Sequence, residues 1–195
     1  MGTLVAFQSA MADDSEISDV ALVAAVSTGD RAALATLYRR HHAVVYRFVA
    51  RLAGVGSGDL DDLVQATFLA VHRAAARYEE RASVTTWILA IAVRIVGKHV
   101  RTEVRRRGLH SRIAELRVEP PTAPDATAER RELLRRVERG LLDLPHELRA
   151  VFVLCVVEGV SGKDAAAALG MREGTLWRRL HEARTKLREA MERSQ

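Results

Sequence analysis

The sequence contains one cysteine, few aromatic residues and no long apolar run, and each shortage excludes a class of protein. Cys155 is the only cysteine among 195 residues, which excludes an internal disulfide and a cysteine-rich metal site. Aromatic residues make up 5% of the chain and the apolar residues are mainly Ala, Leu and Val, a composition that favours helices over sheets. The apolar runs are far shorter than the ~20 residues that a membrane helix needs, and the first residues do not resemble a secretory signal. We therefore expect an all-α cytoplasmic protein that does not insert into a membrane.

Proline is also scarce, and three of the four prolines fall in one stretch, RVEPPTAPDATA. Prolines at this density exclude a helix and favour an extended connector. We predict a linker over residues 115–128 that joins two small helical domains. The N-terminal domain is expected over 16–114 and the C-terminal domain over 129–195, with residues 1–15 forming a disordered extension.

The net charge of +5 fits a polyanionic partner, although the composition weakens this argument. Of the 30 basic residues only Lys98, Lys163 and Lys186 are lysine. An excess of arginine and alanine is what a GC-rich genome produces without selection for any partner. The positions of the basic residues are therefore more informative than their sum.

The spacing of the apolar residues predicts four helices before the linker. Asp30 is expected to cap the second of them, because its carboxylate can accept hydrogen bonds from the free amides of a first turn. The loop between the third and fourth helices is predicted at Glu79–Val84. The expected helices run from about Ile17 to Ser27, Asp30 to Arg51, Leu60 to Tyr78, and Thr85 to beyond Arg101.

The fourth predicted helix carries a row of basic residues. Arg94, Lys98, Arg101 and Arg105 are separated by four, three and four positions, a spacing that places them on one face of a helix. Glu103 is the only acidic residue in this segment, so the cations have few local partners. The pattern predicts contact with nucleic-acid phosphates, and a solvated charged face is the alternative.

The segment 161–189 has the pattern of a helix-turn-helix. Ala166 is a small residue where two helices can cross, Gly170 permits a left-handed turn, and Leu176 can anchor the second helix. Gly174 and Thr175 are expected to leave backbone amides free at the start of the second helix, where a phosphate can bind. A helical pair in an ordinary bundle is the alternative. The second helix would present several side chains to DNA: Arg178, Arg179, His181 and Arg184.

No arrangement of residues predicts catalysis. The seven histidines lack the spacing of metal ligands, and no Ser/His/Asp arrangement is apparent. We therefore expect no enzyme activity, no metal and no cofactor.

Two long segments resemble bacterial sigma factors of RNA polymerase. DLDDLVQATFLAVHRAAARY, followed by WILAIAVR and a basic stretch, is similar to their second conserved region. LPHELRAVFVLCVVEGVSGKDAAAALGMREGTLWRRLHEARTKLRE is similar to their fourth region. With these two regions and a short linker, the chain resembles the extracytoplasmic-function (ECF) group of the sigma-70 family. The resemblance implies a non-catalytic subunit that binds core RNA polymerase, directs it to promoter DNA and opens the duplex, under the control of an anti-sigma factor.

The resemblance also implies three groups of site residues, and the flap of the second largest polymerase subunit as a further contact. The group that docks on the clamp helices of the largest subunit is Asp61, Asp62, Gln65 and Phe68. The group that recognises and melts the minus-ten element is Tyr78, Glu80, Arg81, Ser83, Trp87, Arg94, Lys98, Arg101 and Arg105. The group that contacts the minus-thirty-five element is Thr175, Trp177, Arg178, Arg179, His181, Glu182 and Arg184.

Several of these residues have a second interpretation. Phe68 and Trp87 are also suited to a core, and Trp177 to packing against its own domain. Family members commonly carry a basic residue at the position of Trp177 and often at that of Glu182, so the recognised DNA sequence does not follow from the resemblance. Two other functions stay open: a free-standing helix-turn-helix regulator, and a sigma-like decoy that binds polymerase or an inhibitor without opening promoters.

Overall fold

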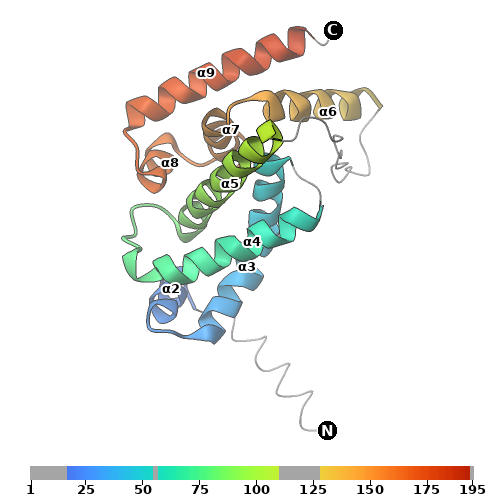
Figure 1. Cartoon of the computed structure of the whole chain (residues 1–195). Helices are drawn as coiled ribbons and strands as arrows, with labels where there is room; N and C mark the ends of the chain where they lie inside the picture. Colours follow the sequence, from blue (N-terminus) through green and yellow to red (C-terminus); the bar gives the residue numbers. More distant parts are fainter. Residues whose placement is uncertain (1–16, 55–56, 110–127, 194–195) are drawn as a thin grey trace.

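The computed structural model describes residues 17–54, 57–109 and 128–193, in which all regular elements are helical (Figure 1). The α-helices are α2 (Asp19–Ser27), α3 (Arg31–Ala53), α4 (Ser57–Ala74), α5 (Val84–Leu109), α6 (Ala128–Asp143), α7 (His146–Phe152), α8 (Gly162–Leu169) and α9 (Glu173–Glu192). A 3₁₀ turn (Ala75–Arg77) follows α4, and a π-helical segment (Val153–Val157) follows α7. None of the described helices is long and apolar enough to cross a membrane. The all-α prediction is confirmed.

The predicted connecting segments fall largely beyond the described residues. The extension 1–15 lies outside them entirely, as does all of the predicted linker 115–128 except its last residue. That residue, Ala128, is the first residue of α6. The boundaries of the two predicted domains stay a prediction.

Local hydrogen bonds set the limits of α3. The Asp30 carboxylate accepts from the amides of Ala32 at 2.8 Å and Ala33 at 3.1 Å, which confirms the predicted cap. At the other end, Gly54 adopts a left-handed conformation with φ of 60°, which a glycine adopts without steric cost. The helix is therefore closed at both ends by residues of the appropriate type.

The third predicted helix ends earlier than expected. It changes to a 3₁₀ turn after Ala74, and Tyr78 is extended rather than helical. The physical reason is aromatic packing, because the extended conformation of Tyr78 lets its ring lie 5.0 Å from that of Trp87 on α5. The prediction of helix up to Tyr78 was wrong by one short turn.

Helices α2 to α5 enclose an apolar core. The most deeply buried large side chains come from three of these helices and have 0% exposure: Leu37, Phe48, Leu52, Val71 and Ile88. They recur at helical spacing, so each helix turns one apolar face inward. Burying such side chains contributes about 1.5–3 kcal/mol each.

The C-terminal half contains the predicted helix-turn-helix. Gly170 ends α8 with φ of 68°, Ala166 is buried, and Leu176 of α9 is fully buried. All three predicted roles are confirmed. The π-helical segment before α8 was not predicted, because the apolar run VFVLCVV reads as an ordinary helix. Cys155 lies in this segment, half-buried, and burial raises the pKa of its thiol.

The two halves of the chain pack against each other. In Figure 1, α5 runs beside α7 and α8, and the contacts between these helices are extensive. Helix α3 also contacts α6 and α7. One hydrophobic cluster includes Phe48 and Ile88 from the N-terminal half together with Leu154, Ala166 and Leu176 from the C-terminal half. The sequence did not predict this association.

Candidate nucleic-acid and polymerase interfaces

The basic face of α5 is exposed where it is described. Arg94, Lys98 and Arg101 are all exposed, and within the described residues none of them forms an ion pair with a carboxylate. The side chain of Arg105 lies outside the described residues. Arg94 donates from Nη2 to the carbonyl oxygen of Ala168, near the end of α8, at 3.1 Å. The cationic row is thus available for phosphates, with one of its members engaged by the helix-turn-helix.

The loop Glu79–Val84, which precedes α5, is held by side chains at its two ends. Tyr78 donates from its hydroxyl to the carbonyl oxygen of Ala82 at 2.8 Å, and burial raises its pKa, so the hydroxyl stays protonated at neutral pH. Ser83 accepts from the amide of Thr86 through Oγ at 3.1 Å, which caps α5. Trp87 is half-buried and its ring lies 5.0 Å from that of Tyr78, so the two rings pack together where the loop begins and where α5 starts.

The tip of this loop presents two charged residues. Arg81 is exposed and pairs with Glu79 at 2.5 Å. Glu80 has φ of 54°, the one positive φ at a non-glycine position among the described residues. Such a conformation is uncommon and is concentrated at functional sites. Sequence reasoning gave no sign of it, because no turn motif marks the position.

The predicted polymerase-docking residues lie on α4. Asp61, Asp62 and Gln65 are exposed, whereas Phe68 is 4% exposed and belongs to the core. Leu69 is instead half-exposed at 50%, four residues after Gln65 and therefore on the same face. That spacing could have identified Leu69 as the apolar residue of this surface.

A second apolar residue extends this surface from α3. The ring of Tyr38 lies 4.8 Å from that of Phe68, and Tyr38 is 40% exposed. The buried phenylalanine thus supports an exposed aromatic neighbour. Tyr38 could not be identified from the sequence, because it lies on a different helix from the acidic residues.

Helix α9, the second helix of the helix-turn-helix, presents most of its predicted residues to solvent. Trp177 is 49% exposed and donates from Nε1 to Glu173 Oε1 at 3.1 Å. Its ring also covers Gly162, where an added Cβ would lie 2.5 Å from Cζ2. Packing of Trp177 against its own domain is therefore confirmed, while contact between its exposed part and DNA stays a prediction. Arg179 is half-buried. The four other predicted residues of this helix are exposed: Arg178, His181, Glu182 and Arg184.

The prediction of free amides at the start of α9 is wrong for Thr175. The amide of Thr175 is not free, because it donates to the carbonyl oxygen of Arg172 at 2.9 Å. Arg172 is the N-cap in an extended conformation, and the first turn of the helix closes on its carbonyl.

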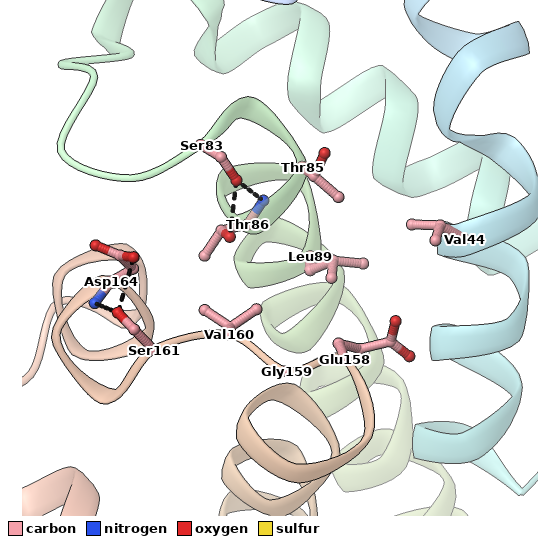
Figure 2. A pocket seen from close by; sticks show the side chains of 10 residues that line it. All are labelled: Val44, Ser83, Thr85, Thr86, Leu89, Glu158, Gly159, Val160, Ser161 and Asp164. Atoms are coloured by element: carbon pink, nitrogen blue, oxygen red, sulfur yellow. Dashed lines mark hydrogen bonds between the residues drawn. The ribbon is translucent and has the colours of Figure 1, made fainter.

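A pocket of about 450 Å³ lies between the start of α5 and the start of α8 (Figure 2). Ser83, Thr86 and Leu89 line it on one side, and Val160 and Ser161 on the other. The end of the loop Glu79–Val84 and the start of the helix-turn-helix therefore face each other across this pocket. No group of three or more metal-ligating side chains is present in the described part of the chain.

Comparison with known proteins agrees with the order of these elements. Residues 37–106 match the Sigma-70 region 2 family, and residues 134–187 match the family described as Sigma-70, region 4. The ECF RNA polymerase sigma factor SigM of Mycobacterium tuberculosis is 38% identical over 180 residues, which cover 88% of this chain and 84% of SigM. SigC of the same species is 38% identical over 175 residues, 90% of this chain and 91% of SigC.

Solved structures have the same fold. CnrH, in complex with the cytosolic domain of CnrY, is 28% identical, with a TM-score of 0.62 over 91% of this chain and 99% of that one. The sigma factor RpoE of Bartonella quintana, in complex with the anti-sigma factor NepR, is 21% identical, with a TM-score of 0.65 over 80% and 94% of the two chains. With both regions matched in order and relatives matched along most of their length, the chain belongs to the ECF RNA polymerase sigma factors of the sigma-70 family.

Proposed function

We propose that this sigma factor docks on core RNA polymerase through α4 and contacts promoter DNA through α5 and α9. The observation that carries the proposal is the presence of three different exposed surfaces on one chain. Helix α4 is acidic with an apolar neighbour, α5 is basic, and α9 is the second helix of a helix-turn-helix. The chain acts in the cytoplasm, where the polymerase is, and catalyses no bond chemistry of its own.

The α4 surface suits a protein partner that carries positive charge. Asp61 and Asp62 supply the complementary charge, which favours fast and oriented association. Leu69 and Tyr38 supply apolar area beside them. The partner is the pair of clamp helices of the largest polymerase subunit, while the flap of the second largest subunit contacts the C-terminal half.

The α5 surface suits a melted strand. Unstacking a base from the duplex costs a few kcal/mol, which a pocket for the flipped base and contacts to the backbone can offset. The pocket for the flipped base would be formed by the loop Glu79–Val84, in which Glu80 and Arg81 are exposed. The packed rings of Tyr78 and Trp87 join the two ends of this loop. The cations of α5 hold the backbone of the same strand, so recognition of the minus-ten element and melting occur together.

The α9 surface suits the major groove at the minus-thirty-five element. Arg178 and Arg184 contact phosphates or guanine edges, and Glu182 accepts from cytosine. We further propose that an anti-sigma factor binds this chain when it is inactive. Two protein structures of this fold, one containing CnrY and the other the anti-sigma factor NepR, support that proposal.

The test is transcription by purified core polymerase from a pooled promoter library, with and without the chain. Transcripts that depend on the chain are expected, and their sequences give both promoter elements. Polymerase binding without transcripts would identify a decoy. Absence of both would favour a free-standing regulator, provided that the core polymerase comes from a compatible bacterium. The same assay is repeated with the variant Asp61→Lys/Asp62→Lys. This variant should remain folded, because both positions are exposed, but it should lose polymerase binding.

Trp177→Arg is expected to change the preferred base at one minus-thirty-five position. Glu173 already uses the indole N–H, so Trp177 offers DNA only apolar contact, as to a thymine methyl. An arginine can bind the O6 and N7 atoms of guanine, which discriminates by about 1–3 kcal/mol, or roughly 5- to 150-fold. The measurement is promoter selection from the same library. The control is Thr185→Arg, which adds the same charge at another exposed position on α9 and should leave the selected sequence unchanged. If Trp177→Arg also leaves the selected sequence unchanged, Trp177 does not contact bases.

A further inference from the structure

Helix α3 carries a polar cluster that none of the three proposed surfaces uses. His41 on α3 is only 6% exposed, and its Nε2 atom lies 2.9 Å from Oδ2 of Asp19, the first residue of α2. The other carboxylate oxygen of Asp19 accepts from Nη1 of Arg40 at 2.7 Å. Arg40 also donates to the carbonyl oxygen of Ile17 at 2.8 Å. The carboxylate of Asp19 thus fixes the start of α2 to the middle of α3.

The same cluster reaches both ends of the loop Glu79–Val84. On the side of α5, Nδ1 of His41 lies 3.5 Å from Oγ1 of Thr85, in the first turn of that helix. On the other side, α2 packs against the 3₁₀ turn that leads into Tyr78. Burial is the main cause of the raised pKa of Tyr78, and the nearby carboxylate of Asp19 adds to it. Asp19 and His41 therefore lie beside the two residues that flank the loop.

Contacts within the loop segment set its shape but not its place on the domain. The bond from the Tyr78 hydroxyl to Ala82 joins two residues of the segment 78–87. The cap that Ser83 gives to the amide of Thr86 is also internal (Figure 2). Among the polar contacts of this segment within the described residues, the one between Thr85 and His41 joins it to another helix. The position of the loop relative to α3 therefore depends on the cluster around His41.

We propose that Asp19 and His41 are positioning residues, which hold the two ends of the loop Glu79–Val84 against α2 and α3 so that the loop meets an unstacked minus-ten base in one place. The inference rests on the proposed function for the role of this loop. Neither residue contacts the DNA in this arrangement, because His41 is buried and Asp19 is engaged by two side chains of α3. A loop that is already placed loses less conformational freedom when it captures a base, which favours melting.

Two substitutions of His41 test whether its polar contacts matter. His41→Leu fills the buried site with an apolar side chain and removes both contacts, whereas His41→Gln keeps a polar group that can reach the Asp19 carboxylate. Open-complex formation on a duplex promoter is expected to fall about tenfold with leucine, the effect of losing one bond to a charged group, and to be largely restored with glutamine. Equal losses in the two variants would show that the polar contacts do not act on opening.

A double variant tests whether the two residues act together. Asp19→Ala/His41→Leu should reduce opening little more than Asp19→Ala alone, because the two side chains act through one contact. Losses that multiply across the two sites would mean that Asp19 and His41 act separately, which contradicts the proposed pair.

A promoter with a mismatched, already open minus-ten region separates positioning from general damage. On this promoter, His41→Leu should support nearly the same transcription as the unaltered chain, because the cost of unstacking no longer opposes the complex. The matched control is Thr67→Val, which removes the bond from a fully buried side chain of α4 to the carbonyl oxygen of Leu63. It should affect duplex and open promoters alike. If His41→Leu also loses equally on both promoters, the cluster acts only on the stability of the domain.

Hydrogen exchange tests the placement of the loop without reference to promoters. The amides of Thr86 and Trp87 both bond to Ser83, so their exchange reports whether the start of α5 stays ordered. His41→Leu is expected to speed exchange in a peptide that spans residues 78–87 about tenfold, with α9 unchanged. Unchanged exchange over 78–87 would overturn the proposal. If the unaltered chain opens no promoter, the proposed function fails, while the exchange result still decides whether Asp19 and His41 hold the loop.

Discussion

Replacing Arg94 and Lys98 with alanine should reduce promoter opening at least tenfold while core polymerase binding stays unchanged. Both cations lie on the exposed face of α5, and neither pairs with a carboxylate in the described part of the chain. Each phosphate contact contributes about one unit to the slope of log K against log salt concentration, so the slope should fall by about 2. The measurement is the salt dependence of open-complex formation.

The bond between Arg94 and the C-terminal half bears on this prediction. Removing Arg94 also removes its bond to the carbonyl oxygen of Ala168 on α8, so the two halves are held together less tightly in the variant. A loss of promoter opening therefore cannot result from tighter association of the halves. Arg31→Ala/Arg47→Ala removes the same charge from exposed positions on α3 and should change opening by less than about twofold, as expected of surface charges away from the DNA. An equal loss in both variants would mean that overall charge, rather than the α5 face, determines binding.

Replacing Arg149 with methionine should reduce the free energy of unfolding by about 3 kcal/mol, because buried acceptors that lose a charged donor cost about 1–3 kcal/mol each. Three carbonyl oxygens, of Leu52, Leu142 and Leu144, lose their donor in this variant. Methionine retains most of the apolar volume, so a cavity contributes little to the loss. The measurement is urea denaturation followed by circular dichroism.

The control for Arg149 is Arg47→Met, which removes the same charge at an exposed site on α3. It should change the free energy of unfolding by less than about 0.5 kcal/mol, as is usual for surface substitutions. Burial lowers the pKa of Arg149, with the charge of Asp143 acting in the opposite direction, yet the guanidinium stays charged at neutral pH. A loss below about 1 kcal/mol for Arg149→Met would show that the three carbonyls find other donors.

Local sequence patterns predicted the helices and the helix-turn-helix well. Asp30, Gly170 and Leu176 act through neighbours within a few positions, so each role can be read from spacing. The exposed basic row of α5 and the exposed face of α9 likewise follow from the helical spacing of their residues. Features of this kind need no knowledge of which helices meet.

The association of the two halves could not be predicted in that way. An added Cβ at Gly97 on α5 would lie 2.8 Å from Nε2 of His146 on α7, yet these residues lie far apart in the sequence, and neither belongs to a pattern until the helices are placed together. Arg149 reads as one more arginine in a sequence rich in them, although it is buried at two helix ends. The positive φ of Glu80 occurs in a loop whose ends are joined by the packed rings of Tyr78 and Trp87, which lie on different elements. All of these depend on tertiary contacts rather than on local preference.

The most direct test of the central claim is permanganate reactivity of thymines in a promoter selected by this chain. Permanganate oxidises unstacked thymines, so it reports melting itself rather than binding. Core polymerase with the chain should make thymines in the minus-ten region reactive, whereas core polymerase alone, or with Arg94→Ala/Lys98→Ala, should leave them protected. Stable binding of the complete complex to the promoter without reactive thymines would contradict the claim that this sigma factor opens DNA.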